Sequence, residues 1–141
     1  MDRKGSAVWQ GTIKEGKGTV STESGALKEA PYSFTSRFEQ GAGTNPEELL
    51  GAAHAGCFSM ALSGQLGAEK LTAERISTTA TVTVEKLESG FTITRVHLAV
   101  EAKIAGTDQA TFERLAGAAK AGCPVSKLFN ANITMDAKLV G

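Results

Sequence analysis

The chain has 141 residues, of which 41% are hydrophobic and 21% charged, and its 15 Lys and Arg residues balance 15 Asp and Glu residues. This length and composition fit one globular domain, so we expect a single domain over residues 1–141. Because neither sign of charge is in excess, a nucleic-acid partner or an anionic membrane surface is not expected. Residues 1–5 lack the apolar stretch of a secretory signal, which predicts a cytoplasmic protein with reduced thiols.

The first third of the chain predicts three strands. Residues 7–13 alternate loosely between apolar and polar, and the β-branched residues 19–22 return as a hairpin partner after a turn rich in Gly and Lys. Aromatic residues spaced over residues 32–38 predict a third strand.

A long helix is expected over residues 45–67. Asn45 supplies the N-cap, Pro46 takes the first helical position, and Glu48 completes a capping pattern. Residues 49–68 form an uncharged stretch that is as long as a membrane-spanning helix. Their His, Ser, Gln and Gly residues favour a buried central helix instead. Its many Gly and Ala residues would let another backbone, expected to be a helix, pack closely. A second subunit would cover the remaining apolar surface.

The second half predicts a long hairpin of residues 76–87 and 91–103, where β-branched side chains alternate. A helix from about residue 108 to residue 121, a short helical turn over residues 124–129 and a final strand over residues 133–140 follow. The order β-β-β-α-β-β-α-α-β lacks the strict alternation of parallel α/β proteins. We therefore expect an α+β fold with a mostly antiparallel sheet around the buried helix.

Cys57 and Cys123 are the only thiols, and each follows an Ala-Gly pair. Two thiols within reach of each other form a redox couple that cycles between dithiol and disulfide, whereas two separate thiols are simply small buried side chains. The residues alone leave both interpretations open. A reactive thiol needs a lowered pKa, because at the ordinary pKa of about 8.5 only about 3% is ionised at neutral pH.

The two thiols differ in their expected surroundings. Cys57 lies about three turns inside the long helix, beyond the reach of the helix dipole, so a side chain must activate it. Cys123 precedes Pro124 at the start of a short helix, where free N–H groups favour an anion, so local physics makes it the more acidic thiol. His54 shares a helix face with Cys57, which allows a thiolate–imidazolium pair, a partial metal site with Cys123, or an ordinary interfacial histidine. His97, in a strand, is expected to be structural.

Other catalytic signatures are missing from the sequence. It has no phosphate-binding loop with a following Lys-Ser or Lys-Thr, no Gly-x-Ser-x-Gly turn, no HExxH motif and no paired CxxC motifs. We therefore expect neither a metal nor a cofactor.

Three stretches resemble the OsmC/Ohr family, most closely its OsmC branch. They are TNPEELL at residues 44–50, AAHAGCFSMAL at residues 52–62 and AGCPVS at residues 121–126. Residues 18–25 and the final strand fit as well, so the resemblance spans essentially the whole chain. It implies an OsmC-like fold in an intertwined homodimer.

The resemblance implies a thiol-dependent peroxidase, an antioxidant hydroperoxide reductase of the response to oxidative or osmotic stress. Such enzymes reduce organic hydroperoxides to alcohols, and hydrogen peroxide less efficiently. The resemblance assigns Cys57 as the peroxidatic cysteine and Cys123 as the resolving cysteine, joined in a redox-active disulfide that a dithiol, suggested to be a lipoyl group, reopens. It also assigns Arg37 as the activating arginine and Glu47 as its acidic partner. A guanidinium keeps its charge and offers several donors, so Arg37 could stabilise a thiolate.

Three questions stay open at this point. Ten residues of helix, about 15 Å, separate Glu47 from Cys57, so either Arg37 spans that distance or Glu47 acts in the partner subunit's site, which we expect. A non-catalytic dimer that binds a hydrophobic ligand, with both cysteines as packing, is the main alternative to an enzyme. A hydrolytic cysteine enzyme with His54 as base is a further alternative, although nothing evident orients that base.

Overall fold

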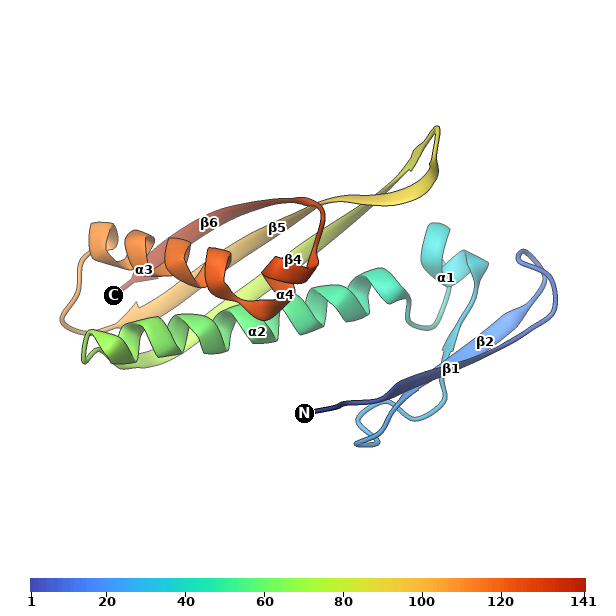
Figure 1. Cartoon of the computed structure of the whole chain (residues 1–141), viewed down its shortest axis with the longest axis horizontal. Helices are drawn as coiled ribbons and strands as arrows, with labels where there is room; N and C mark the ends of the chain where they lie inside the picture. The colour runs from blue at the N-terminus through green and yellow to red at the C-terminus, as the bar shows by residue number, and fades with distance from the viewer. The chain divides into compact units, whose positions relative to one another are not determined.

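The computed structural model describes residues 1–141, which form two compact units, Met1–Leu49 and Leu50–Gly141. Each unit, called here the N-terminal and the C-terminal unit, holds one three-stranded sheet (Figure 1). The long helix α2, Pro46–Ala68, begins in the N-terminal unit and continues into the C-terminal unit. That all 141 residues form one OsmC-like domain stays a prediction.

The N-terminal unit contains an antiparallel sheet of three short strands. They are β1 (Gly5–Gln10), β2 (Lys17–Thr22) and β3 (Ala30–Tyr32), in the spatial order β1-β2-β3. The predicted hairpin of the first two strands is confirmed, because Gly5 lies opposite Thr22 and the register continues to the turn.

The expected third strand is wrong beyond Tyr32, because the chain turns there into the short helix α1, Phe34–Phe38. A capping box starts this helix: the Ser36 amide donates to the Ser33 hydroxyl at 3.2 Å, and the Ser33 amide donates to the Ser36 hydroxyl at 2.8 Å. The rings of Phe34 and Phe38 pack with their centroids 5.1 Å apart, as residues four apart on a helix do. A spacing of four residues suits both a strand and a helical turn, and the cap decides for the helix.

The C-terminal unit is built on the predicted long hairpin. β4 (Ala73–Leu87) pairs antiparallel with β5 (Gly90–Ile104), and β6 (Asn132–Val140) pairs parallel with β5 on its other side. A parallel neighbour needs a crossover, which α3 (Gln109–Gly122) and α4 (Pro124–Leu128) provide. The other strand pairs are antiparallel, so the mostly antiparallel α+β prediction is confirmed.

The core of the C-terminal unit lies between its sheet and the helices α2 and α3, which cover the same face (Figure 1). Along β5, Leu98 and Val100 are buried, whereas Ala99 and Glu101 between and beside them are exposed. The helices contribute large, fully or nearly fully buried side chains to the same cluster: Phe58, Leu62, Leu66, Phe112 and Leu115. This packing fixes the helices that carry both cysteines.

The long helix α2 starts as predicted, because Asn45 Oδ1 accepts a hydrogen bond from the Glu48 amide at 2.8 Å. Its small residues do not all admit another helix. A Cβ added at Gly51 would lie 3.0 Å from the Ala80 carbonyl oxygen, so a strand, β4, makes that close approach. A Cβ at Gly56 would meet nothing within 4 Å, and Met60 is 79% exposed. Within one chain α2 is therefore buried on one side only, and its cover by a second subunit stays a prediction.

The chain has no helix with both the length and the apolar character that crossing a membrane requires.

Candidate active site

The two cysteines lie in contact although 66 positions separate them in the sequence. Their sulfur atoms are 2.8 Å apart and both thiols are free. A disulfide has a sulfur–sulfur distance of about 2.05 Å, so bond formation requires less than about 1 Å of approach. Cys57 is partly exposed, whereas Cys123 is completely buried. The structure therefore brings together the pair that could form a redox couple.

The backbone holds Cys123 from both sides. Cys123 ends α3, where its amide donates to the Ala119 carbonyl at 2.9 Å, and it precedes α4, where its carbonyl accepts from the Lys127 amide at 3.1 Å. Pro124 at the first position of α4 suits this junction, because it has no N–H to satisfy there. Cys57 projects from the middle of α2, next to the fully buried Phe58.

The surroundings make Cys123 the more acidic of the two thiols. Burial raises the pKa of Cys57, and its hydrogen bond with Cys123 raises it further. Burial also opposes ionisation of Cys123, but the Cys57 thiol 2.8 Å away and the nearby amide and hydroxyl of Ser126 favour its thiolate and lower the Cys123 pKa. The Cys123 sulfur makes no regular capping hydrogen bond in α4, so the nearby amides act on it mainly through their dipoles. No cation contributes to the Cys57 shift.

Arg37 and Glu47 form a forked ion pair within the N-terminal unit. Nε and Nη2 of Arg37 both donate to Glu47 Oε1, at 3.0 and 2.9 Å. The Glu47 side chain is 9% exposed and that of Arg37 is 37% exposed. The Arg37 guanidinium also lies 5.0 Å from the centre of the Phe38 ring. The two contacts hold a guanidinium in a set orientation while leaving part of it open to solvent.

An aromatic hollow of about 200 Å³ adjoins Arg37 in the N-terminal unit. Its walls come from β1, β3 and α1 and from the segment after β1: Trp9, Ile13, Tyr32, Ser33, Phe34, Arg37 and Phe38. Sequence reasoning missed this hollow, because it depends on α1, which was expected to be a strand. A hollow with apolar walls and one cation suits a ligand with an apolar part and a polar end.

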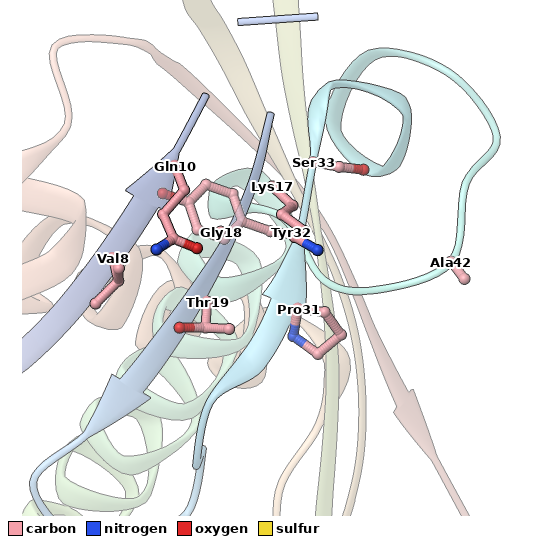
Figure 2. A pocket seen from close by; sticks show the side chains of 9 residues that line it. All are labelled: Val8, Gln10, Lys17, Gly18, Thr19, Pro31, Tyr32, Ser33 and Ala42. Carbon is pink, nitrogen blue, oxygen red and sulfur yellow. The ribbon is translucent and has the colours of Figure 1, made fainter. Parts of the chain in front are cut away.

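A second hollow, of about 280 Å³, lies over the strands of the N-terminal unit (Figure 2). Side chains of all three strands line it, among them Gln10, Lys17 and Tyr32 (Figure 2). It contains no thiol, so it offers no group for thiol-based redox chemistry.

His54 does not bond to either thiol. Its Nε2 lies 2.7 Å from the Ser126 hydroxyl, and its ring packs 5.2 Å from the ring of Phe129. The residue is completely buried, and burial lowers the pKa of His54, which disfavours an imidazolium. The possible thiolate–imidazolium pair is therefore not formed. No group of three or more His, Cys, Asp or Glu side chains is placed to hold a metal ion.

His97, on β5, lies on the polar face of the sheet, on the side away from the hydrophobic core. Its Nδ1 is 2.6 Å from the Thr134 hydroxyl and its Nε2 is 3.1 Å from Asp136, both on β6. The parallel register places Thr134 opposite His97. This acidic neighbour could not be read from the sequence around His97.

A family model described as OsmC-like protein matches residues 39–138. The chain belongs to the OsmC-like family. Peroxiredoxin OsmC of Escherichia coli (strain K12) is 55% identical over 139 residues, which cover 99% of this chain and 97% of that protein. The predicted membership of the OsmC/Ohr family is thereby confirmed, and the OsmC-like chain is a peroxidase.

Solved structures of related proteins share the fold. An organic hydroperoxide resistance protein OsmC from Legionella pneumophila is 28% identical, with a TM-score of 0.68 over 98% of this chain and 97% of that chain. An OsmC-like protein from Mycoplasma pneumoniae is 14% identical, with a TM-score of 0.77 over 100% of this chain and 99% of that chain. The predicted OsmC-like fold is confirmed.

Proposed function

We propose that this OsmC-like peroxidase reduces organic hydroperoxides to alcohols, with Cys57 as the attacking thiol and Cys123 as the resolving thiol. The 2.8 Å contact between their sulfur atoms is the observation that carries the proposal. Exposure distinguishes the roles: a peroxide can reach the partly exposed Cys57, but not Cys123, which is completely buried. The more acidic thiol is thus kept for the second step.

The proposed cycle has three steps. The Cys57 sulfur attacks the distal peroxide oxygen, the O–O bond breaks, and the alcohol leaves with a proton, so Cys57 becomes a sulfenic acid. The Cys123 sulfur then attacks the Cys57 sulfur and expels its hydroxyl group as water, which closes the disulfide. An external dithiol, for which we propose a lipoyl group, reduces the disulfide and is itself oxidised.

Cys57 needs a cation to ionise, because its own unit raises its pKa. Arg37 is the candidate, since Glu47 orients it and a third of its side chain stays accessible. A charge-assisted contact from a guanidinium to the Cys57 sulfur would favour the thiolate and lower the Cys57 pKa. Because ten residues separate Glu47 from Cys57 in the sequence, we propose that the Arg37–Glu47 pair serves Cys57 of the partner subunit in a homodimer.

The aromatic hollow beside Arg37 supports an organic hydroperoxide as the preferred substrate. Its apolar walls could accept an alkyl or aryl group, while the guanidinium could hold the peroxide end. Hydrogen peroxide has no apolar part to bury there and is expected to react more slowly. We propose that the enzyme works in the cytoplasm, where such dithiols are kept reduced.

A thiol count before and after one equivalent of cumene hydroperoxide tests the function. A peroxidase of this kind loses both free thiols and releases one equivalent of the alcohol. A non-catalytic module that binds hydrophobic ligands would keep both thiols, and this outcome would overturn the proposal. The hydrolytic alternative gains no support, because the His54 ring bonds to Ser126 and not to a cysteine.

A further inference from the structure

A polar contact between His54 and Ser126 links α2, which carries Cys57, to α4, which begins directly after Cys123. His54 precedes Cys57 by three residues on α2, and Ser126 follows Cys123 by three residues on α4. The His54 Nε2 and Ser126 Oγ atoms are 2.7 Å apart, with His54 fully buried and Ser126 7% exposed. Ser126 is the third residue of α4, the helix whose N-cap is Cys123, and its hydroxyl helps to lower the Cys123 pKa. The His54–Ser126 contact therefore lies within one helical turn of Cys123.

The other ring nitrogen of His54 decides the direction of the hydrogen bonds. Nδ1 is buried and has no hydrogen-bond partner. If Nδ1 carried the proton, the structure would hold an orphaned N–H donor, which is rarer and costlier than an unused acceptor. The proton therefore belongs on Nε2, which donates to the Ser126 oxygen. The single hydroxyl hydrogen of Ser126 is then free to point at the Cys123 sulfur.

We propose that His54 is a positioning residue for Cys123: through Ser126 it aims a hydroxyl hydrogen at the Cys123 sulfur and holds that thiol ready to attack. This inference rests on the resolving role proposed for Cys123. His54 itself neither gains nor loses a proton in the cycle, because a buried imidazole resists becoming charged. It acts as a fixed donor, not as a base.

The arrangement matters in the second step of the cycle. The Cys123 thiolate attacks the sulfenic sulfur of Cys57, the S–OH bond breaks, and hydroxide leaves and takes a proton from solvent. The rate depends on the fraction of Cys123 present as thiolate. A charged acceptor strengthens the Ser126 hydrogen bond, so the contact favours the reactive form of Cys123.

A thiolate titration in a Cys57→Ser background tests the proposed positioning role without any peroxide. Only Cys123 then contributes to the ultraviolet thiolate absorbance as the pH rises. We expect Ser126→Ala to reduce the thiolate fraction at neutral pH about tenfold, as loss of one hydrogen bond to an ionised group does. His54→Leu is expected to reduce it about threefold, whereas His54→Gln, whose amide can donate from a similar place, stays near the parent.

Matched variants separate positioning from mere packing. Ser59→Ala removes a different hydroxyl, on α2, that bonds to Thr78 at 2.8 Å, and is expected to leave the titration unchanged. Equal shifts in His54→Leu and His54→Gln, or no shift in Ser126→Ala, would overturn the proposal. If His54→Leu does not fold, Ser126→Ala against Ser126→Thr decides, because Thr keeps the hydroxyl and must retain the low titration midpoint.

A kinetic experiment distinguishes failure of this proposal from failure of the proposed peroxidase function. With Cys57 restored and one equivalent of cumene hydroperoxide, dimedone trapping followed by mass spectrometry reports the lifetime of the sulfenic acid. Ser126→Ala is expected to lengthen that lifetime about tenfold while the rate of Cys57 oxidation stays unchanged. If the peroxidase mechanism is wrong, no sulfenic acid forms in any variant, and the titration still decides the role of His54.

Discussion

Arg37 and Glu47 meet in a forked ion pair, with two nitrogens of the guanidinium donating to one carboxylate oxygen. Such a fork fixes the plane of the guanidinium, which a single contact does not. Glu47 also lies in the first turn of α2, where the helix dipole favours its negative charge. The pair therefore specifies an orientation for Arg37 as well as a charge.

We expect this orientation to matter for the first step. Arg37→Lys keeps the charge but loses the fork, and is expected to slow Cys57 oxidation on the order of 100-fold, as loss of a transition-state donor does. Glu47→Ala leaves Arg37 unheld and is expected to slow it about tenfold. Stopped-flow rates with cumene hydroperoxide measure both. Unchanged rates in Arg37→Lys would remove Arg37 from the mechanism.

Substitution of each cysteine by serine is expected to impair the reaction in a different way. Cys57→Ser abolishes turnover, because the buried Cys123 cannot meet the peroxide. Cys123→Ser permits one stoichiometric turnover, after which the sulfenic acid has no resolving thiol and advances to sulfinic acid with excess peroxide. Intact-mass spectrometry distinguishes these products. Full catalytic turnover by Cys57→Ser would contradict the assignment.

The burial of His54 predicts a specific loss of stability at mildly acidic pH. Burial lowers the pKa of His54, so below about pH 6.5 the unfolded chain binds a proton that the folded chain does not. The free energy of unfolding therefore falls as the pH drops from 6.5 toward the lowered pKa, by at most about 1.4 kcal/mol per pH unit. Urea unfolding at a series of pH values measures it.

His54→Gln is expected to flatten that pH dependence, since Gln does not titrate. Ser59→Ala, on the same helix, is the control and is expected to keep the slope, because it removes no titratable group. Equal slopes in the parent and His54→Gln would show that His54 is not the group responsible.

The exposed side of α2 provides a test of the proposed homodimer. Met60 is 79% exposed in the single chain, and a partner subunit against this side would bury it. Met60→Glu is then expected to place a charge in the interface and convert dimer to monomer, whereas Met60→Leu keeps the parent mass. Light scattering measures the mass. A parent chain that is monomeric at all concentrations would exclude the dimer.

The correct parts of the fold prediction came from local sequence patterns such as helix caps. Asn45 and Pro46 predicted the start of α2 correctly, because cap chemistry is local. The segment 34–38 could not be assigned in the same way, since the four-residue spacing of its two Phe rings fits both strand and helix. The parallel pairing of β6 depends on the crossover through α3, which no local pattern encodes.

The candidate site likewise has parts that the sequence predicted and a part that only the structure shows. Resemblance named Cys57, Cys123, Arg37 and Glu47, and local physics predicted the order of acidity of the two thiols. The bond from His54 to Ser126 spans 72 positions and arises only when α4 packs against α2. Long-range contacts of this kind follow from tertiary packing, so the sequence left His54 with three interpretations.

The junction at Cys123 has a consequence for the reductant. Because helical hydrogen bonds hold this residue on both sides and the sulfurs are already in contact, the proposed disulfide would form by a small side-chain movement without refolding. The oxidised and reduced enzymes then present nearly the same surface. In the proposed cycle, a regenerating dithiol would therefore distinguish the two forms by its reaction with the disulfide sulfur and not by the shape of the enzyme surface.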